Sequence, residues 1–151
     1  MASRPQELLQ LLTRAERLSV RRVQSVLDEF DCSVEAWRVL GLLSEGGHHM
    51  SVIADRTSLP APTLTKLVDQ LVDQNLVYRR IDPADRRRVL AYLTPRGMER
   101  RQRLDRQVRA DWLELGGSDD EELRTLLARL ADALEGRATT DREGRSVERA
   151  H

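Results

Sequence analysis

The spacing of apolar side chains along the chain predicts six helices. From about residue 6 to residue 30, leucines and valines recur every three or four positions, which is helical spacing with a broad apolar face. The same kind of pattern predicts further helices over residues 34–43, 52–57, 62–74, 95–115 and 121–135. Residues 136–151 are polar and lack periodicity, so they are expected to form a flexible tail.

The two helices in the middle of the chain are joined by only about four residues. Two helices joined by so short a turn form a helix-turn-helix. The second of them has one apolar face, formed by Leu64, Leu67, Val68, Leu71 and Val72. Asn75 follows this helix and is expected to take the left-handed conformation that ends a helix, because Asn tolerates it.

Two short runs rich in β-branched and aromatic residues, 76–81 and 89–94, come next. This composition is typical of strands. The turn formers Asp82, Pro83 and Asp85 lie between the runs. The pattern therefore predicts a hairpin with a polar tip.

The order of elements defines the expected fold class, which is mainly α with a small β-hairpin wing. Residues 33–94 are expected to form a winged helix-turn-helix. The flanking segments, residues 1–32 and 95–135, carry more apolar surface than one winged helix could cover. A second copy of the chain is the natural cover, so these segments are expected to form the helical dimerisation region of a symmetric homodimer.

Charge and cysteine content narrow the class of function. Basic and acidic side chains balance at 25 each, which argues against general binding to polyanions. Residues 51–96 nevertheless carry eight basic and five acidic side chains, and this excess suits a modest local basic surface. Cys32 is the single cysteine, so no intrachain disulfide is expected. With no signal peptide or membrane-length apolar run visible, the expected location is the cytoplasm.

The segment "LTKLVDQLVDQNLVYRRIDPADRRRVLAYLTPRG", residues 64–97, resembles the core of the MarR family of bacterial transcriptional regulators. The matching features are the second helix of the helix-turn-helix, the following Arg-Arg strand, the Asp-Arg-Arg wing starting at Asp85, and Leu-Thr-x-x-Gly ending at Gly97. The resemblance extends over about residues 6–135. The sequence departs from the family pattern at Asn75, where the family has Gly, and in the proline-rich entry at residues 59–63.

The resemblance implies binding to double-stranded DNA, and the residue types agree with it. A helix fits the major groove and presents its N-terminal side chains to base edges. The candidates on the helix are Pro62, Thr63, Thr65, Lys66 and Gln70. In the wing they are Arg86, Arg87 and Arg88, because a narrow minor groove attracts arginine. Strand alternation and the family pattern favour Arg87 for insertion.

The resemblance also implies a small anionic aromatic or phenolic effector. Arginines would pair with its carboxylate and an aromatic side chain would supply an apolar wall. The candidate residues are Arg14, Arg17, Arg21, Trp37, Arg38, His48 and His49. No acid–base or nucleophile set is visible, so neither an enzyme nor a cofactor is expected.

The sequence therefore predicts a homodimeric DNA-binding regulator, a repressor that binds a pseudo-palindromic operator and is released by the effector. Two alternatives stay open. One is a regulator that senses redox state or metal through Cys32 or the His48/His49 pair. The other, of a different class, is a winged-helix protein–protein adaptor. The effector, the operator, the regulated genes and the sign of regulation are not encoded in any recognisable pattern.

Overall fold

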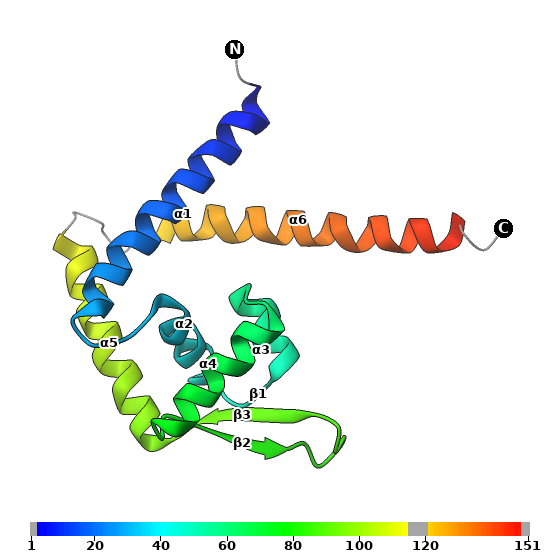
Figure 1. The fold of residues 1–151 in the computed structure, drawn as a ribbon. Coiled ribbons are helices and arrows are strands. Elements are labelled where there is room, and N and C mark those ends of the chain that lie inside the picture. Colours follow the sequence, from blue (N-terminus) through cyan, green and yellow to red (C-terminus); the bar gives the residue numbers. More distant parts are fainter. Residues whose placement is uncertain (1–2, 115–120, 149–151) are drawn as a thin grey trace. The chain divides into compact units, whose positions relative to one another are not determined.

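The computed structural model describes residues 3–114 and 121–148, with side chains described through residue 136. The elements, shown in Figure 1, are α1 (Arg4–Asp28), α2 (Val34–Leu43), β1 (His48–His49), α3 (Met50–Thr57), α4 (Ala61–Asp73), β2 (Val77–Ile81), β3 (Val89–Leu93), α5 (Pro95–Glu114) and α6 (Glu121–Glu148). The expected class, mainly α with a small β-hairpin wing, is confirmed. No helix in these described ranges has the length and apolar character needed to cross a membrane.

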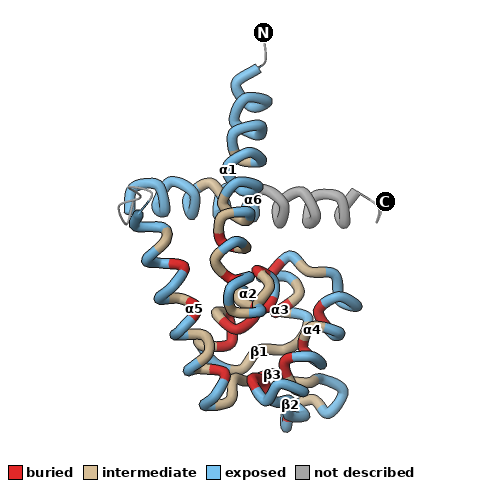
Figure 2. Tube along the Cα trace, turned by 60° about the vertical axis from the view of Figure 1, so that its left-hand side comes forward, coloured by how far each residue is buried: buried red, intermediate tan, exposed pale blue. Residues whose placement is uncertain are grey.

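The described residues divide into two compact units, one ending at Asp111 and the other starting at Trp112. The core of the first unit is formed where the C-terminal half of α1, the helices α2 to α4, the sheet and α5 meet, as Figure 2 shows in red. Its fully buried members include Leu27, Val39, Ile53, Val68 and Leu104. The N-terminal half of α1 is exposed along its length (Figure 2). The core thus holds the helix-turn-helix and the sheet as one body.

The wing is part of a three-stranded antiparallel sheet with strand order β1-β3-β2. In the hairpin, Val77 lies opposite Leu93 and Ile81 opposite Val89. The predicted hairpin is therefore present, and its turn projects beyond α3 and α4 in Figure 1. The third strand, β1, is a two-residue strand that pairs with β3 through His48 and His49. It was not predicted, because two residues are too few to show an alternating pattern.

The start of α5 is fixed against the end of α4 and the start of the wing. Asn75 has φ 58°, as predicted for a residue that ends a helix. The Thr94 hydroxyl donates to the Asn75 carbonyl at 2.7 Å and accepts from the Gly97 N–H at 2.9 Å. The Thr94 N–H donates to the Leu76 carbonyl at 3.1 Å. Thr94 is thus the N-cap of α5, and Pro95 occupies the first helical position.

Several helix boundaries differ from the expected ones. Ser33 caps α2, with its hydroxyl accepting from the Ala36 N–H at 3.0 Å, and this helix has its expected bounds. Ser51 before the expected helix 52–57 is a residue type that caps helices, but α3 starts at Met50 and His49 occupies the N-cap position. The backbone of α6 is helical to Glu148, beyond the expected end near residue 135. A single glycine such as Gly136 costs a helix about 1 kcal/mol, which does not end it. The sequence at 118–121 is typical of a capping box, and it lies largely outside the described residues.

Candidate nucleic-acid interface

Helix α4 buries one side and presents the other. Leu64, Val68 and Leu71 are buried against the core. All five side chains predicted to read DNA, Pro62, Thr63, Thr65, Lys66 and Gln70, are exposed. The Thr65 hydroxyl donates to the Ala61 carbonyl at 3.0 Å, so toward a ligand it acts as an acceptor. This face can therefore donate through Lys66 and Gln70 and accept through Thr65 and Gln70.

The first wing strand is tied to α4 by an ion pair between Arg79 and Asp69. Asp69 lies on the exposed side of α4, where a free carboxylate would repel phosphate. Arg79 supplies the compensating charge from β2. The pair therefore neutralises this part of the reading face and links the position of α4 to that of the wing.

Asp82 lies at the base of the wing and is buried although it is charged. Its carboxylate accepts from His49 Nε2 at 2.6 Å and from the Ala84 N–H at 2.9 Å. The hydrogen bond from His49, followed by that from Ala84, holds the pKa of the Asp82 carboxyl below its usual value. The Asp82 N–H also donates to the Arg88 carbonyl at 3.0 Å. These bonds fix the turn of the wing and fasten it to β1.

The wing tip presents its arginines to solvent. Asp85 accepts from the Arg87 N–H at 3.1 Å and from Arg87 Nε at 3.3 Å. Even so, the Arg87 side chain is 92 % exposed. Arg86 and Arg88 are exposed as well. Asp85 thus orients Arg87 at the tip and leaves the end of its guanidinium group accessible.

The residues predicted to bind an effector fall into separate places in the structure. Arg14 and Arg17 line a hollow of about 430 Å³ along α1, together with Leu9, Gln10 and Thr13. Arg21 is exposed on the same helix. Trp37 Nε1 donates to Asp105 Oδ1 at 2.7 Å, which attaches α2 to α5. Arg38 lies 4.0 Å from the Glu16 carboxylate.

The two histidines lie in β1, apart from this group in the fold. His49 bonds Asp82 at the wing base, as described above. His48 Nε2 is buried, and no hydrogen-bond partner for it exists among the described residues. Within the part of the chain that the structure describes, no cluster of three or more His, Cys, Asp or Glu side chains could hold a metal ion. The structure therefore places both histidines in the sheet and does not bring them together with the predicted effector residues on α1 and α2.

Cys32 lies between α1 and α2 and is half-buried. Burial raises the pKa of its thiol, against smaller opposing effects from Arg100 and from the Trp37 N–H. A thiol with a raised pKa forms little thiolate at neutral pH and reacts slowly with oxidants. This environment does not favour the redox-sensing alternative.

Sequence reasoning missed three features of the interface and its surroundings. Asp82 was identified only as a turn former, although it is the acceptor that holds the wing to β1. The Arg79–Asp69 pair joins residues ten positions apart on different elements. The third feature is a cleft on α5 lined by arginines at positions 96, 100 and 103. The spacing of these arginines by four and three residues was the signal available in the sequence, since such residues share one helix face.

These features define a winged helix-turn-helix protein with long flanking helices and an exposed basic wing. The sequence model of the MarR family matches residues 30–88. Over these residues the chain is similar to members of the MarR family of transcriptional regulators.

The fold is similar to that of solved structures from this family over most of the chain. The transcriptional regulator BldR from Sulfolobus solfataricus has a TM-score of 0.74 and 25% identity, over 89% of this chain and 99% of that chain. NadR in complex with 4-hydroxyphenylacetate has a TM-score of 0.75 and 26% identity, over 87% and 96%. AbsC from Streptomyces coelicolor has a TM-score of 0.70 and 24% identity, over 90% and 98%, which is a likeness of fold. A comparison with curated protein sequences finds no match.

Proposed function

We propose that the protein is a homodimeric repressor that binds a pseudo-palindromic DNA operator through α4 and the wing. The observation that carries the proposal is the 92 % exposed Arg87 at a wing tip fixed by Asp85 and Asp82. The exposed polar face of α4 lies in the same compact unit, joined to the wing strand by the Arg79–Asp69 pair. Such a unit suits a helix in the major groove with an arginine in the neighbouring minor groove.

The test is a titration of duplex DNA from the region upstream of the protein's own gene, followed by fluorescence anisotropy at several salt concentrations. Arg87→Ala should weaken binding and lower the slope of log affinity against log salt by about 1, the effect of removing one positive charge from the DNA interface. Arg106→Ala is the matched control, because Arg106 is an exposed arginine on α5 outside this surface. Binding that depends neither on salt nor on Arg87 would favour the protein–protein adaptor instead.

The homodimer is supported by apolar side chains left exposed at both ends of the chain. They are Leu8, Leu9, Leu11 and Leu18 in α1, and Leu123, Leu126, Leu127 and Leu134 in α6. Large apolar side chains exposed in series along a helix are typical of a protein–protein interface. Sedimentation velocity at micromolar concentration should give the mass of two chains, and a monomer would contradict the dimer.

The proposed effector is a small aromatic or phenolic acid. NadR, 26% identical to this chain, is bound to 4-hydroxyphenylacetate. Arg14 and Arg17, which line one hollow on α1, are the proposed partners of the carboxylate. Release of DNA by a panel of such acids, and loss of that release in Arg14→Ala or Arg17→Ala, would support the assignment. A normal response in both variants would refute it.

A further inference from the structure

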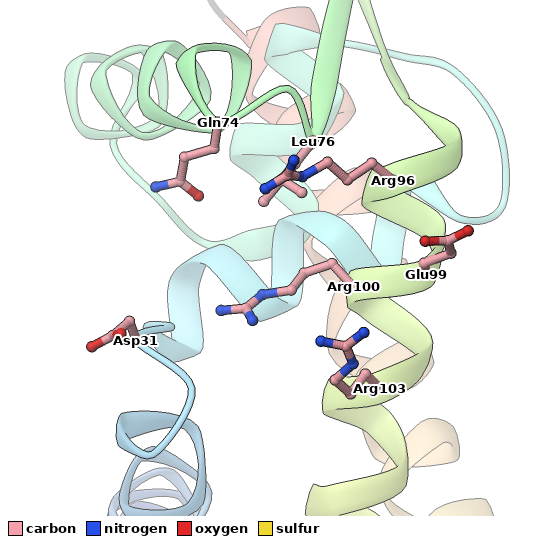
Figure 3. Close-up of a pocket in the computed structure, with 7 residues that line it drawn as sticks. All are labelled: Asp31, Gln74, Leu76, Arg96, Glu99, Arg100 and Arg103. Atoms are coloured by element: carbon pink, nitrogen blue, oxygen red, sulfur yellow. The ribbon is translucent and has the colours of Figure 1, made fainter.

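A cleft beside the C-terminal end of α4 is lined by three arginines of α5 (Figure 3). Its volume is about 690 Å³. The polar side chains that line it are Arg96, Arg100, Arg103, Gln74, Asp31 and Glu99. In Figure 3 the three guanidinium groups extend from α5 toward the side of Asp31 and Gln74. The arginines share one face of α5, because residues spaced by four and three positions do so.

The positive charge in this cleft exceeds the negative charge, since three arginines face two carboxylates. Within the described part of the chain, no ion pair and no side-chain hydrogen bond involves Arg96 or Arg103, and both side chains are exposed. Arg100 differs, because its guanidinium donates to the Phe30 carbonyl. Arg96 and Arg103 are therefore available to an anion, and a guanidinium group matches the geometry of a phosphate.

The cleft adjoins the exposed face of α4 that we propose reads DNA. A neighbouring space of about 210 Å³ shares Gln74 and Arg100 with the cleft and is also lined by Gln70. Gln70 is one of the proposed reading residues, and Gln74 follows it by one helical turn at the C-cap of α4. The polar surface of α4 thus continues through these two glutamines to the arginines of α5.

The wing and the arginine cleft lie on different flanks of the reading face of α4. Asp69 pairs with Arg79 of the first wing strand, whereas Gln70 lines the space beside the cleft. Consecutive residues of a helix are turned by about 100° from each other, so these two side chains mark two flanks. A helix in the major groove has a phosphate backbone along each flank. The wing can serve one backbone, and the cleft is placed to serve the other.

The start of α5 is held at a fixed position relative to α4. The Thr94 hydroxyl donates to the Asn75 carbonyl just beyond α4 and accepts from the Gly97 N–H in the first turn of α5. Arg100 fastens the next turn to the segment after α1 through the Phe30 carbonyl. A duplex bound to α4 would therefore meet the arginines of α5 without rearrangement of the backbone, which lowers the cost of binding.

We propose that Arg96 and Arg103 bind phosphates of the operator DNA on the flank of α4 opposite the wing. The inference rests on the proposed function, and it adds a second group of DNA-binding residues outside the helix-turn-helix and the wing. Charge complementarity and continuity with the reading face identify the occupant of the cleft as the DNA backbone. Phosphate contacts carry no sequence information, so these arginines add affinity without adding sequence preference.

The test compares Arg96→Gln/Arg103→Gln with the wild-type protein in the anisotropy titration described above. The double variant should lower the slope of log affinity against log salt by about 2 for each bound chain, and weaken binding at low salt about tenfold or more. Arg96→Lys/Arg103→Lys keeps the charges and should keep most of the slope. The loss in the glutamine variant should be equal for the operator and for an unrelated duplex of the same length.

Uncharged methylphosphonates, placed one at a time along each strand of the duplex, locate the contact. At the phosphates bound by Arg96 and Arg103, the substitution should weaken wild-type binding severalfold and leave the glutamine variant unaffected. Arg106→Gln is the matched control, because Arg106 is an exposed arginine of α5 outside the cleft lining and should behave as wild type. Equal thermal melts of the variants and the wild type would show that no loss comes from unfolding.

The outcomes separate this inference from the proposed function. If Arg87→Ala loses affinity and the glutamine variant keeps the wild-type slope, DNA binding stands and the α5 contact is refuted. The contact is also refuted if Arg106→Gln loses as much affinity, or if every methylphosphonate weakens the variant as much as the wild type. If the wild-type protein binds no duplex in a salt-dependent manner, both proposals fall, and an acidic protein partner becomes the better occupant of the cleft.

Discussion

Replacing Gly97 with alanine should destabilise the winged helix, because α5 starts directly against the end of α4. A Cβ atom added to Gly97 would lie 2.0 Å from the Leu76 carbonyl oxygen and 3.1 Å from Leu93 Cδ2. Cβ atoms essentially never approach another heavy atom more closely than 3.0 Å. Because the nearest atom belongs to the backbone, the two segments must separate by about 1 Å, and no side-chain rotation can avoid it.

The expected cost follows from these contacts. Overpacking of this kind costs about 1–3 kcal/mol. The same Leu76 oxygen accepts from the Thr94 N–H at 3.1 Å, so the separation also weakens a bond worth about 1 kcal/mol. Alanine regains up to about 1 kcal/mol through its greater helix propensity. The net loss in the free energy of unfolding is therefore about 1–3 kcal/mol.

Urea unfolding followed by circular dichroism measures this difference, at one fixed protein concentration because dimer formation would make stability depend on concentration. Gly41→Ala is the matched control. Gly41 lies inside α2, and a Cβ atom there would meet nothing within 4 Å. It should raise stability by about 0.5–1 kcal/mol. If Gly97→Ala raised stability to a similar extent, the close contact with Leu76 would be refuted.

Three further predictions concern single side chains. Arg79→Ala should weaken DNA binding because it leaves the Asp69 carboxylate uncompensated on α4, and the Arg79→Ala/Asp69→Ala double variant should regain affinity in the anisotropy titration; a double variant that is no better than the single one would contradict this. The hydrogen bond from His49 lowers the pKa of the Asp82 carboxyl below its usual value of 3.8. The ionised carboxylate therefore stabilises the fold fully above that pH, and this stabilisation is lost as the pH falls toward the lowered pKa. Thermal melts from about pH 5 down to about pH 3 should therefore show a shallower acid loss in Asp82→Asn, and identical profiles would count against the bond. Cys32 should react with iodoacetamide more slowly than free cysteine, because burial raises its pKa, and equal rates at pH 8 would disprove that environment.

Local signals in the sequence predicted most of the fold. Helix α2 has its expected bounds, because Ser33 and the periodic apolar residues mark a helix without reference to the rest of the molecule. The hairpin and the left-handed Asn75 were predictable for the same reason. The exposed wing arginines followed from their place between two strands. Each of these features depends on residues close together in the chain.

The hydrogen-bond partners of the predicted effector residues could not be predicted from such local signals. The family resemblance and the residue types placed Trp37 and His49 in one predicted effector set, and in the structure Trp37 bonds Asp105 while His49 bonds Asp82. These partners lie 68 and 33 positions away in the chain. No local pattern marks a hydrogen bond over that separation.

The sequence by itself determined the order of helices and strands, because periodicity, capping and turn formation act over a few residues. Tertiary structure decided which charges are neutralised and which stay available. It paired Asp69 with Arg79 and Asp82 with His49, and it left Arg96 and Arg103 exposed. The physical reason is that a charge is compensated by whatever group packing brings within hydrogen-bond distance, and packing joins segments far apart in the chain.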